Sequence, residues 1–476
     1  MLQVQNRPRN ERWRMTLHSN VPWDDLQAGM SAEITHLCRA EDFYVFANSS
    51  GNMNPMHLPR EDGDGDGSPE AVAPSMWLGA LISGVLGNTL PGPGTLYQRQ
   101  TLTFTGRAHA GDTVVVRVRL IDKGADRLAR FETRVELADG TPVAHGEAEV
   151  TAPATKVTVD LRDVPGLTVQ THPHFDRLLQ EAEPIPPMPT AVVMPQDAAS
   201  LGGAILGWRH TLLTPILIGE RARILATAEE IGEDISDLEI IDVAGHGPEA
   251  ARLAVDLVRS GRAKALMKGK LHTDDLLRAV LSKTDGLRTG RRLSHVFVMD
   301  VPGVDHLLMV SDAAINIAPD LMDKVDIVQN AINLAHSLGQ DTPKVGILSA
   351  VETVNPNMPS TLDAAILSKM ADRGQITGGM VDGPLAMDNA IDLEAARTKG
   401  ISSAVAGHAD ILIVPNLEAG NMLAKELTFV AHALAGGAVL GAACPIILTS
   451  RADDEKARLL SCAIAVLHQA KTRGTV

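Results

Sequence analysis

The chain of 476 residues has the composition of an ordinary globular protein, with 45% hydrophobic and 21% charged residues. Its formal net charge of −15 argues against a nucleic-acid or anionic-membrane partner, and an aromatic content of 3% leaves few rings for stacking bases. At roughly 150 residues per domain, this length predicts two to four domains.

The cysteines and the first residues indicate a compartment. Cys38, Cys444 and Cys462 are far apart and form neither a disulfide framework nor a zinc-binding spacing. Residues 1–20 are basic, lack the apolar segment of a signal peptide, and are predicted to form a disordered or loosely docked arm. These features favour a reduced, cytoplasmic setting.

Residues 21–151 combine a long helix with several strands. The helix is predicted at Ser75–Leu90, where apolar residues recur at helical spacing. A helix wrapped by an antiparallel sheet is the economical packing, so an α+β domain is expected. The strands, separated by Gly-containing turns, are predicted at Leu96–Thr105, Thr113–Asp122, Arg127–Leu137 and Thr141–Thr151.

Residues 152–189 are predicted to be a Pro-rich linker, because four prolines near its end favour an extended spacer. From Thr190 to the C-terminus, short apolar strands alternate with helices, which predicts an α/β architecture with parallel strands covered on both faces. The strand count exceeds that of one sheet, so two lobes are expected. The nearly apolar run Val430–Leu448 is interpreted as a helix end, a loop and a buried strand rather than a membrane span, because Gly and Pro interrupt it.

Two polar turns frame the most informative stretch, Gly346–Ile391. It opens with a short apolar strand, Gly346–Val351, and a turn that begins with Glu352 follows. A helix comes next, and then a second polar turn that ends at Asp388. Ligands in open α/β sheets sit where strands end and helices begin, so both turns are candidate walls of a ligand cleft.

This stretch resembles the phosphate acetyl/butyryltransferase family, which converts acyl-CoA and inorganic phosphate into acyl phosphate and CoA. The resemblance implies a two-lobed α/β phosphotransacylase over 190–476 with mostly parallel sheets. Lobe one would comprise residues 190–290 plus 440–476, lobe two would comprise 295–438, and the active cleft would lie between them. The likeness continues through the motifs ALMKGKLHTDDLLRAVL, MVSDAAINIAPDL and ILTSRADDEKARLLS.

Cationic residues near two predicted helix starts are candidates for binding phosphate. Ser450 and Arg451 follow a strand and open a helix, whose free N–H groups and Arg fork suit an oxyanion; the pair matches a family active-site motif. Arg278 could be a solvated helix residue paired with Asp274, but it matches a family arginine on the cleft-facing helix, which favours a functional role. Lys268 ends the preceding strand, where it could contact phosphate or CoA.

Several carboxylates and one amide are weaker candidates for substrate binding. Asp312 and Asn316 match a family signature at a strand end but could mainly hold the turn. Glu352 and Asp388 occupy the two polar turns, where capping and turn formation are the simpler explanations.

One position departs from the acetyltransferase branch of the family. That branch has an Asp, proposed as the base, seven residues after the Ser of the Ser-Arg pair, whereas this chain has Ala457. A carboxylate nearer to the Ser-Arg pair could act as the base in place of that Asp, or the reaction could use no protein base. The segment TSRADDEKARLLS looks closer to the butyryltransferase branch.

The N-terminal region resembles the MaoC-like hydratase branch of the hot-dog fold, through SSGNMNPMHLP, ALISGVLGNTLPGPGTLY and AGDTV over residues 21–151. The family motif places an Asp five residues before a His to activate water for addition to an enoyl thioester. Here the His is His57, but the Asp position holds Asn52, and an amide cannot accept a proton near neutral pH. Ser83 corresponds to a family active-site serine and could equally serve packing.

Together these patterns predict a multidomain phosphate acyltransferase fused to a degenerate hydratase-like domain. Phosphate would attack the thioester directly in a ternary complex, with no metal or cofactor. The expected partners are acyl-CoA and phosphate, with neither nucleic acid nor membrane, in a homo-oligomer of at least two chains. The alternative is a non-catalytic acyl-CoA-sensing or scaffolding module; a nicotinamide dehydrogenase is disfavoured because no G-x-G-x-x-G follows a predicted strand.

Overall fold

The structure is a computed structural model in which the chain forms two compact units, Met1–Val169 and Gln170–Val476. The chain is therefore multidomain, as the sequence predicts. The structure describes residues 2–4, 17–60, 71–160, 167, 169–245, 247–448 and 455–472.

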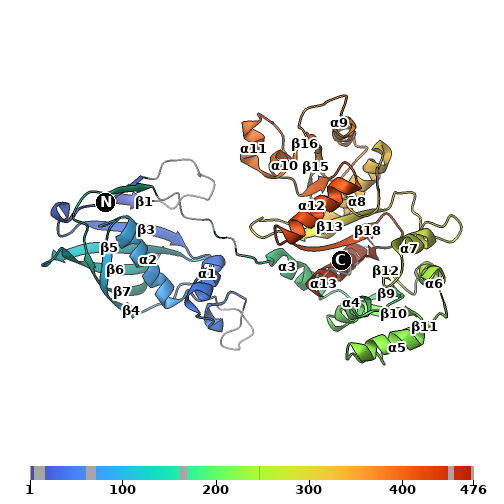
Figure 1. Ribbon diagram of the computed structural model, residues 1–476, viewed down its shortest axis with the longest axis horizontal. Helices are drawn as coiled ribbons and strands as arrows, with labels where there is room; N and C mark the ends of the chain where they lie inside the picture. The colour runs from blue at the N-terminus through green and yellow to red at the C-terminus, as the bar shows by residue number, and fades with distance from the viewer. Residues whose placement is uncertain are drawn as a thin grey trace. The chain divides into compact units, whose positions relative to one another are not determined.

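The N-terminal unit is a six-stranded sheet that packs against the long helix α2 (Ser75–Asn88), as Figure 1 shows. Trp77, Ile82 and Leu86 of α2 are buried against the alternate buried residues of the strands, which is the packing that the sequence pattern predicts. All pairs are antiparallel except the first. The strands lie in the order β1 (Leu2–Val4), β3 (Ser31–Leu37), β5 (Thr113–Lys123), β6 (Leu128–Leu137), β7 (Pro142–Thr151) and β4 (Leu96–Phe104).

Several short elements complete this unit. The helix α1 (Ala40–Ser50) ends at Gly51, whose φ of 72° is the left-handed conformation that glycine adopts readily. The sequence predicts a disordered or loosely docked arm over 1–20; disorder is wrong for the residues that the structure describes there, because they pair with other strands. The pairs join β1 to β3, and β2 (Leu17–Ser19) to β8 (Thr158–Asp160).

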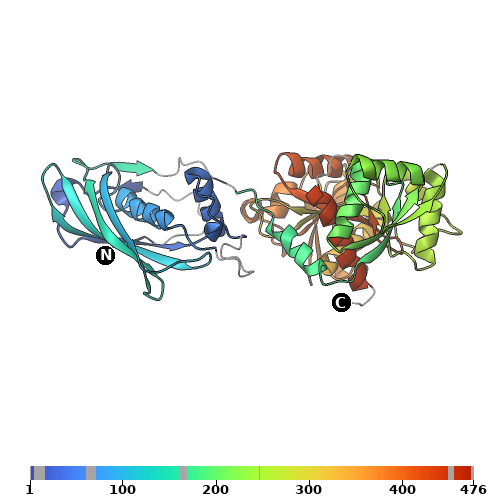
Figure 2. The same ribbon diagram turned by 90° about the horizontal axis from the view of Figure 1, so that it is seen from below.

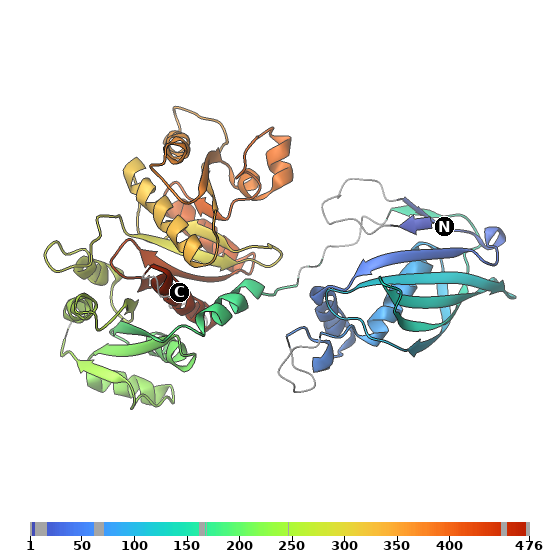
Figure 3. The ribbon, with the colours of Figure 1, turned by 180° about the vertical axis from the view of Figure 1, so that it is seen from behind.

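The predicted linker 152–189 is also partly wrong, because it contains the helix α3 (Pro173–Ala182). Phe175 and Leu178 of this helix are buried in the core of the C-terminal unit, and Figure 3 shows α3 beside the last helix, α13 (Glu455–Thr472). The carboxylate of Asp300 accepts a hydrogen bond from the Phe175 N–H at 2.8 Å and so caps the first turn. The prolines indicated an extended spacer, but the segment before them is amphipathic and forms a helix because the neighbouring core buries its apolar face.

The C-terminal unit is built on one continuous sheet of eleven strands, which corrects the expectation of separate sheets. Its two halves are joined by a single antiparallel pair, Val439 with Ile446. Five strands of the first half are parallel, and so are four of the second, with β13 and β18 antiparallel between them. The order is β11 (Glu239–Asp242), β10 (Leu213–Gly219), β9 (Met188–Val193), β12 (Ala265–Lys268), β19 (Ile446–Ile447), β18 (Leu434–Leu440), β13 (Ser294–Asp300), β14 (Leu308–Ser311), β17 (Ile411–Ile413), β15 (Lys344–Leu348) and β16 (Met380–Leu385).

Helices cover both faces of this sheet (Figure 2). On one face a single core runs across both halves, beneath α3, α4 (Ala198–Arg209), α5 (Arg221–Glu230), α8 (Leu321–Ser337), α9 (Pro359–Asp372) and α13. On the other face the core is split in two. One part lies beneath α6 (Gly247–Arg259) and α7 (Thr273–Val280), and the other beneath α10 (Met387–Ile391), α11 (Leu393–Thr398) and α12 (Leu417–Phe429).

Two predicted loops are strands in the structure. The second polar turn of the stretch Gly346–Ile391 forms the edge strand β16, and the Gly436-Gly437 pair lies inside β18. At Gly436 an added Cβ would lie 2.6 Å from Cγ of Leu460, so the glycine lets α13 approach the sheet closely. Glycine here serves packing rather than a turn, and only the tertiary contact distinguishes the two.

Candidate functional site: a cavity between the halves of the sheet

A cavity of about 910 Å³ opens where the core on one face of the sheet is split. Leu448 on its wall packs against the core of the first half, and Phe297 and Ala435 pack against that of the second. The cavity wall is therefore built from residues of both halves of the sheet. Its size is in the range of small-molecule sites.

The wall of this cavity is cationic. Among the described residues that line it, there are two lysines, Lys268 and Lys425, and no Asp or Glu. The described wall also contains three histidines, His172, His295 and His432. In a chain whose net charge is −15, this local excess of positive charge suits an anionic ligand.

Lys268 and the first turn of α7 come from one strand–helix connection. Lys268 ends β12, is half-buried and donates to the Gly269 carbonyl at 3.3 Å. A Cβ at Gly269 would lie 2.5 Å from the Val193 carbonyl, so only glycine lets the strand pass this close to β9. The connection brings Thr273, the first residue of α7, to the cavity wall, where the N–H groups of the first helical turn favour an anion.

His295 forms a buried part of the wall in β13. Its side chain is 2% exposed and packs edge-on to Phe297, with ring centroids 4.3 Å apart. Within the described chain, Nδ1 of the ring is buried and has no hydrogen-bond partner. Burial lowers the pKa of His295 to about 4, although the negative charge of Asp312 opposes this shift, so the imidazole is neutral near pH 7.

A further part of the cavity wall is formed by α13. The Ser461 hydroxyl donates to the Ala457 carbonyl at 3.0 Å and accepts the N–H of Gly437 at 3.1 Å, which ties α13 to β18. Ala457, Ser461 and Gly437 all line the cavity. The sequence reasoning missed His295, Lys425 and Ser461; a histidine within the apolar strand HVFVMD was a signal that could have drawn attention to the first of them.

Ser450 and Arg451 lie outside the described residues. The residues that flank this segment, Leu448 on one side and Ala457 on the other, both line the cavity.

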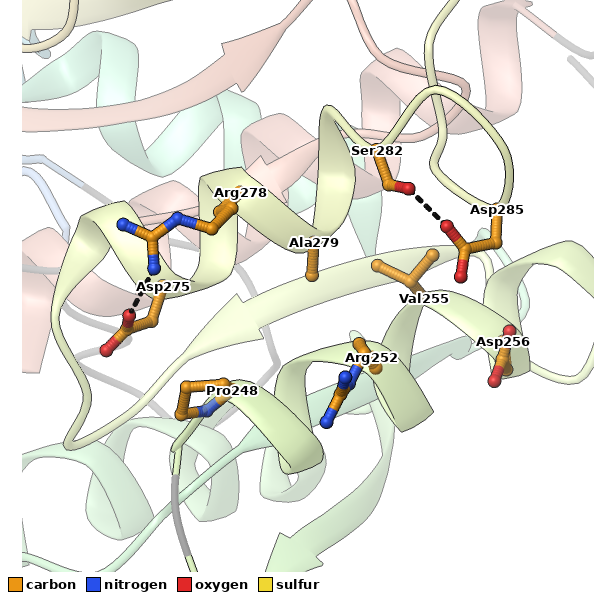
Figure 4. A pocket seen from close by; sticks show the side chains of 9 residues that line it. All are labelled: Pro248, Arg252, Val255, Asp256, Asp275, Arg278, Ala279, Ser282 and Asp285. Atoms are coloured by element: carbon orange, nitrogen blue, oxygen red, sulfur yellow. Dashed lines mark hydrogen bonds and ion pairs between the residues drawn. The ribbon is translucent and has the colours of Figure 1, made fainter.

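Arg278 lies in a second, smaller pocket of about 300 Å³ between α6 and α7 (Figure 4). Its side chain is 75% exposed, and Nη1 donates to Asp275 at 3.2 Å rather than to Asp274. Arg252 faces the same pocket, together with Asp256 and other polar residues. Arg278 is thus not among the described residues that line the larger cavity.

Asp312 and Asn316 form a closed network at the end of β14. The Asp312 carboxylate accepts the N–H groups of Ala314, Ile315 and Asn316, at 3.0 to 3.1 Å. The Asn316 amide donates to that carboxylate at 2.5 Å, and its oxygen accepts the Arg292 Nε–H at 2.8 Å. Both residues are almost fully buried and neither lines the cavity, so the structure gives them a turn-holding role.

Glu352 and Asp388 meet in the second half of the unit. Lys399 bridges them, with Nζ 3.2 Å from Glu352 and 3.0 Å from Asp388. Backbone hydrogen bonding and Lys399 hold the pKa of Glu352 below its ordinary value, and Lys399 does the same for Asp388. The two turns are thus brought together, but these carboxylates do not line the cavity.

In the N-terminal unit, His57 and Asn52 follow α1. Nδ1 of His57 donates to the Val72 carbonyl at 2.9 Å, because a carbonyl can only accept, so the neutral ring carries its lone pair on Nε2. The Asn52 side-chain oxygen accepts the Asn54 N–H at 3.3 Å. Ser83 lies on the exposed face of α2, with no buried packing role.

In the part of the chain that the structure describes, no helix is long and apolar enough to cross a bilayer. The His, Cys, Asp and Glu side chains of this part form no group of three or more that could hold a metal ion.

Known proteins that are similar to this chain include phosphate acyltransferases. The family model described as phosphate acetyl/butaryl transferase matches residues 246–466. A phosphate acetyltransferase of Rhizobium meliloti is 58% identical over 299 residues, 63% of this chain and 94% of the relative. A phosphate butyryltransferase of Clostridium beijerinckii is 45% identical over 301 residues, 63% of this chain and 99% of the relative.

Two solved structures are similar to parts of this chain. A branched-chain phosphotransacylase from Enterococcus faecalis V583 is 30% identical and covers 59% of this chain and 99% of its own, with a TM-score of 0.53. The R-hydratase PhaJ1 from Pseudomonas aeruginosa is 36% identical and covers 32% of this chain and 99% of its own, with a TM-score of 0.31. From the extent and identity of the curated matches, the chain belongs to the phosphate acetyl/butyryltransferase family and is an acyltransferase.

Proposed function

We propose that the C-terminal unit transfers an acyl group between CoA and inorganic phosphate in the cavity of about 910 Å³. The observation that carries the proposal is the composition of its described wall, with Lys268 and Lys425 and no carboxylate, in a member of this family. A phosphate dianion and the phosphates of CoA both need such a surface. The apolar residues of the wall, such as Phe297 and Leu448, suit an acyl chain.

The reaction is a direct displacement in a ternary complex. A phosphate oxygen attacks the thioester carbonyl carbon, the carbonyl oxygen becomes an oxyanion, and the C–S bond breaks with its electron pair on sulfur. Lys268 and the first N–H groups of α7 hold the phosphate, and the same positive charges stabilise the oxyanion. The family resemblance implies that Ser450 and Arg451 also bind the phosphate. The proposed reaction needs no metal or cofactor.

Arg278 acts on the substrate from the neighbouring pocket. Its guanidinium is 75% exposed and has one carboxylate partner, Asp275, so it remains available to an anion. We expect it to attract the phosphates of CoA, which predicts a higher KM for acyl-CoA in Arg278→Ala rather than a lost kcat.

Thiol release from acyl-CoA, with and without phosphate and across acyl lengths, tests the proposal in the full chain. Phosphate-dependent release is expected; it should be abolished in Arg451→Ala and weakened in Arg278→Ala. Arg223→Ala is the matched control, because Arg223 pairs with Glu220 on a distant helix. Thiol release that does not depend on phosphate, or none with any acyl-CoA, would instead favour the acyl-CoA-sensing alternative.

A second candidate function belongs to the N-terminal unit, namely hydration of an enoyl-CoA. The observation that favours it is the Val72 contact, which leaves the His57 Nε2 lone pair available as a base. Asn52 supplies no second base, so we expect weak activity. Hydration of trans-2-enoyl-CoA that does not change in His57→Ala would leave this unit as an acyl-CoA-binding or dimerisation module.

We further propose that the chain assembles at least as a dimer. Light scattering coupled to size-exclusion chromatography tests this, and a monomeric mass at micromolar concentration would contradict it.

A further inference from the structure

His295 has an environment that a structural histidine would not need. It stands in β13 next to the apolar run Val296–Met299, lines the cavity, and is almost fully buried. Within the described chain Nδ1 has no hydrogen-bond partner, and a buried polar atom without a partner costs free energy. The simplest explanation for such a group is that a ligand or the reaction itself uses the imidazole.

The ring of His295 shares a wall with position 457. A Cβ on Gly437 would lie 2.8 Å from Cε1 and 3.1 Å from Nε2 of the ring, so the imidazole lies against the backbone of β18. The Gly437 N–H donates to Ser461, and Ser461 donates to the Ala457 carbonyl. The methyl group of Ala457 cannot accept a proton, whereas the buried imidazole of His295 can, and among the described wall residues no Asp or Glu stands beside it.

We propose that His295 is a catalytic residue that carries the proton from the attacking phosphate to the sulfur of CoA. The inference deepens the proposed function and rests on it. The O–H proton of monohydrogen phosphate passes to the imidazole lone pair as the phosphate oxygen bonds to the carbonyl carbon. The C–S bond then breaks, and the imidazolium returns the proton to the thiolate, so the products are acyl phosphate and the CoA thiol.

Burial suits the imidazole to this relay. It holds the pKa of His295 down to about 4, so the lone pair is free at neutral pH before substrate binds. A phosphate dianion in the cavity raises the pKa of the imidazole, because an opposite charge nearby favours imidazolium. The other charged or titratable groups around it are Asp312, which also raises this pKa, and on the wall His172, Lys268, Lys425 and His432.

His295→Gln in the full chain tests the inference by phosphate-dependent thiol release. A glutamine keeps polarity and similar bulk but cannot take the proton, so kcat should fall by about 100-fold or more while both KM values stay nearly constant. His468→Gln is the matched control. Burial also lowers the pKa of His468 to about 4, but its Nδ1 is bonded to Ser337 at 2.9 Å and it does not line the cavity, so its kcat should be unchanged.

A carboxylate introduced on the same wall distinguishes a role of His295 in proton transfer from a role in packing. Ala457→Asp in the His295→Gln background should recover at least about tenfold in kcat, because it returns a proton acceptor. If circular dichroism shows that His295→Gln is unfolded, the smaller His295→Asn takes its place in both measurements.

The outcomes are distinct. A parent protein without phosphate-dependent thiol release overturns the proposed function and the role of His295 with it. An active parent whose folded His295 variants keep their kcat overturns the relay alone. A fall in kcat that is accompanied by a higher KM, or that Ala457→Asp does not repair, also overturns it and assigns His295 to packing.

Discussion

Replacing Gly437 by alanine probes the close contact between β18 and β13. Gly437 pairs with Phe297 across β18 and β13. The added Cβ would lie 2.5 Å from the Val296 carbonyl and 2.8 Å from Cε1 of His295, closer than real Cβ contacts. The carbonyl is part of the strand backbone and cannot move freely, so the strands must separate or the ring must shift.

The expected cost follows from overpacking a buried site, about 1–3 kcal/mol in the free energy of unfolding. At about 2–4 °C per kcal/mol for a large unit, this lowers Tm by roughly 2–12 °C. The same shift moves the His295 ring, so kcat for thiol release should fall as well. Differential scanning calorimetry and the thiol-release assay measure the two effects in the full chain.

Gly202→Ala is the matched control. Gly202 lies in α4, and nothing lies within 4 Å of the position that its Cβ would take. Alanine there removes a helix-weakening glycine and should raise stability by about 0.5–1 kcal/mol with unchanged kcat. The reasoning is refuted if Gly437→Ala melts at or above the parent Tm with full activity, or if both variants shift Tm in the same direction.

Three further expectations can be checked independently. Leu178→Ala should destabilise the full chain by about 2–5 kcal/mol, whereas Leu225→Ala, at a position 44% exposed, should change the free energy of unfolding little. Equal shifts of Tm in the two variants, measured by calorimetry, would contradict the packing of α3 in the core. Lys399→Met should make the stability of the fold less sensitive to acid. Lys399 lowers the pKa of Asp388 in the folded state, so this carboxylate stabilises the fold above the ordinary Asp pKa of about 3.9, and the stabilisation is lost as pH falls through the folded pKa. If the denaturant midpoints of variant and parent change equally between about pH 5 and 3, the pair is contradicted. Asn52→Asp should increase hydration of trans-2-enoyl-CoA by about 100-fold, followed as loss of enoyl thioester absorbance; no gain would show that the missing carboxylate is not the limiting group.

The sequence alone determined the element types over most of the chain. Alternation in the N-terminal region and the strand–helix repeats after Thr190 follow from local hydrophobic periodicity, which a single sequence carries. The family motifs likewise indicated the acyltransferase. Prolines misled the interpretation of α3, because its helix depends on burying Phe175 and Leu178 in a core built from distant residues.

Tertiary structure alone decided which polar residues share a site. Asp312 and Asn316 looked like ligand contacts but satisfy one another, and Glu352 and Asp388 are joined by Lys399, a partner outside both turns. His295 looked like an ordinary residue of an apolar strand. Its place on the cavity wall results from the single strand pair that joins the halves of the sheet, because residues far apart in the chain meet there and no local pattern encodes that meeting.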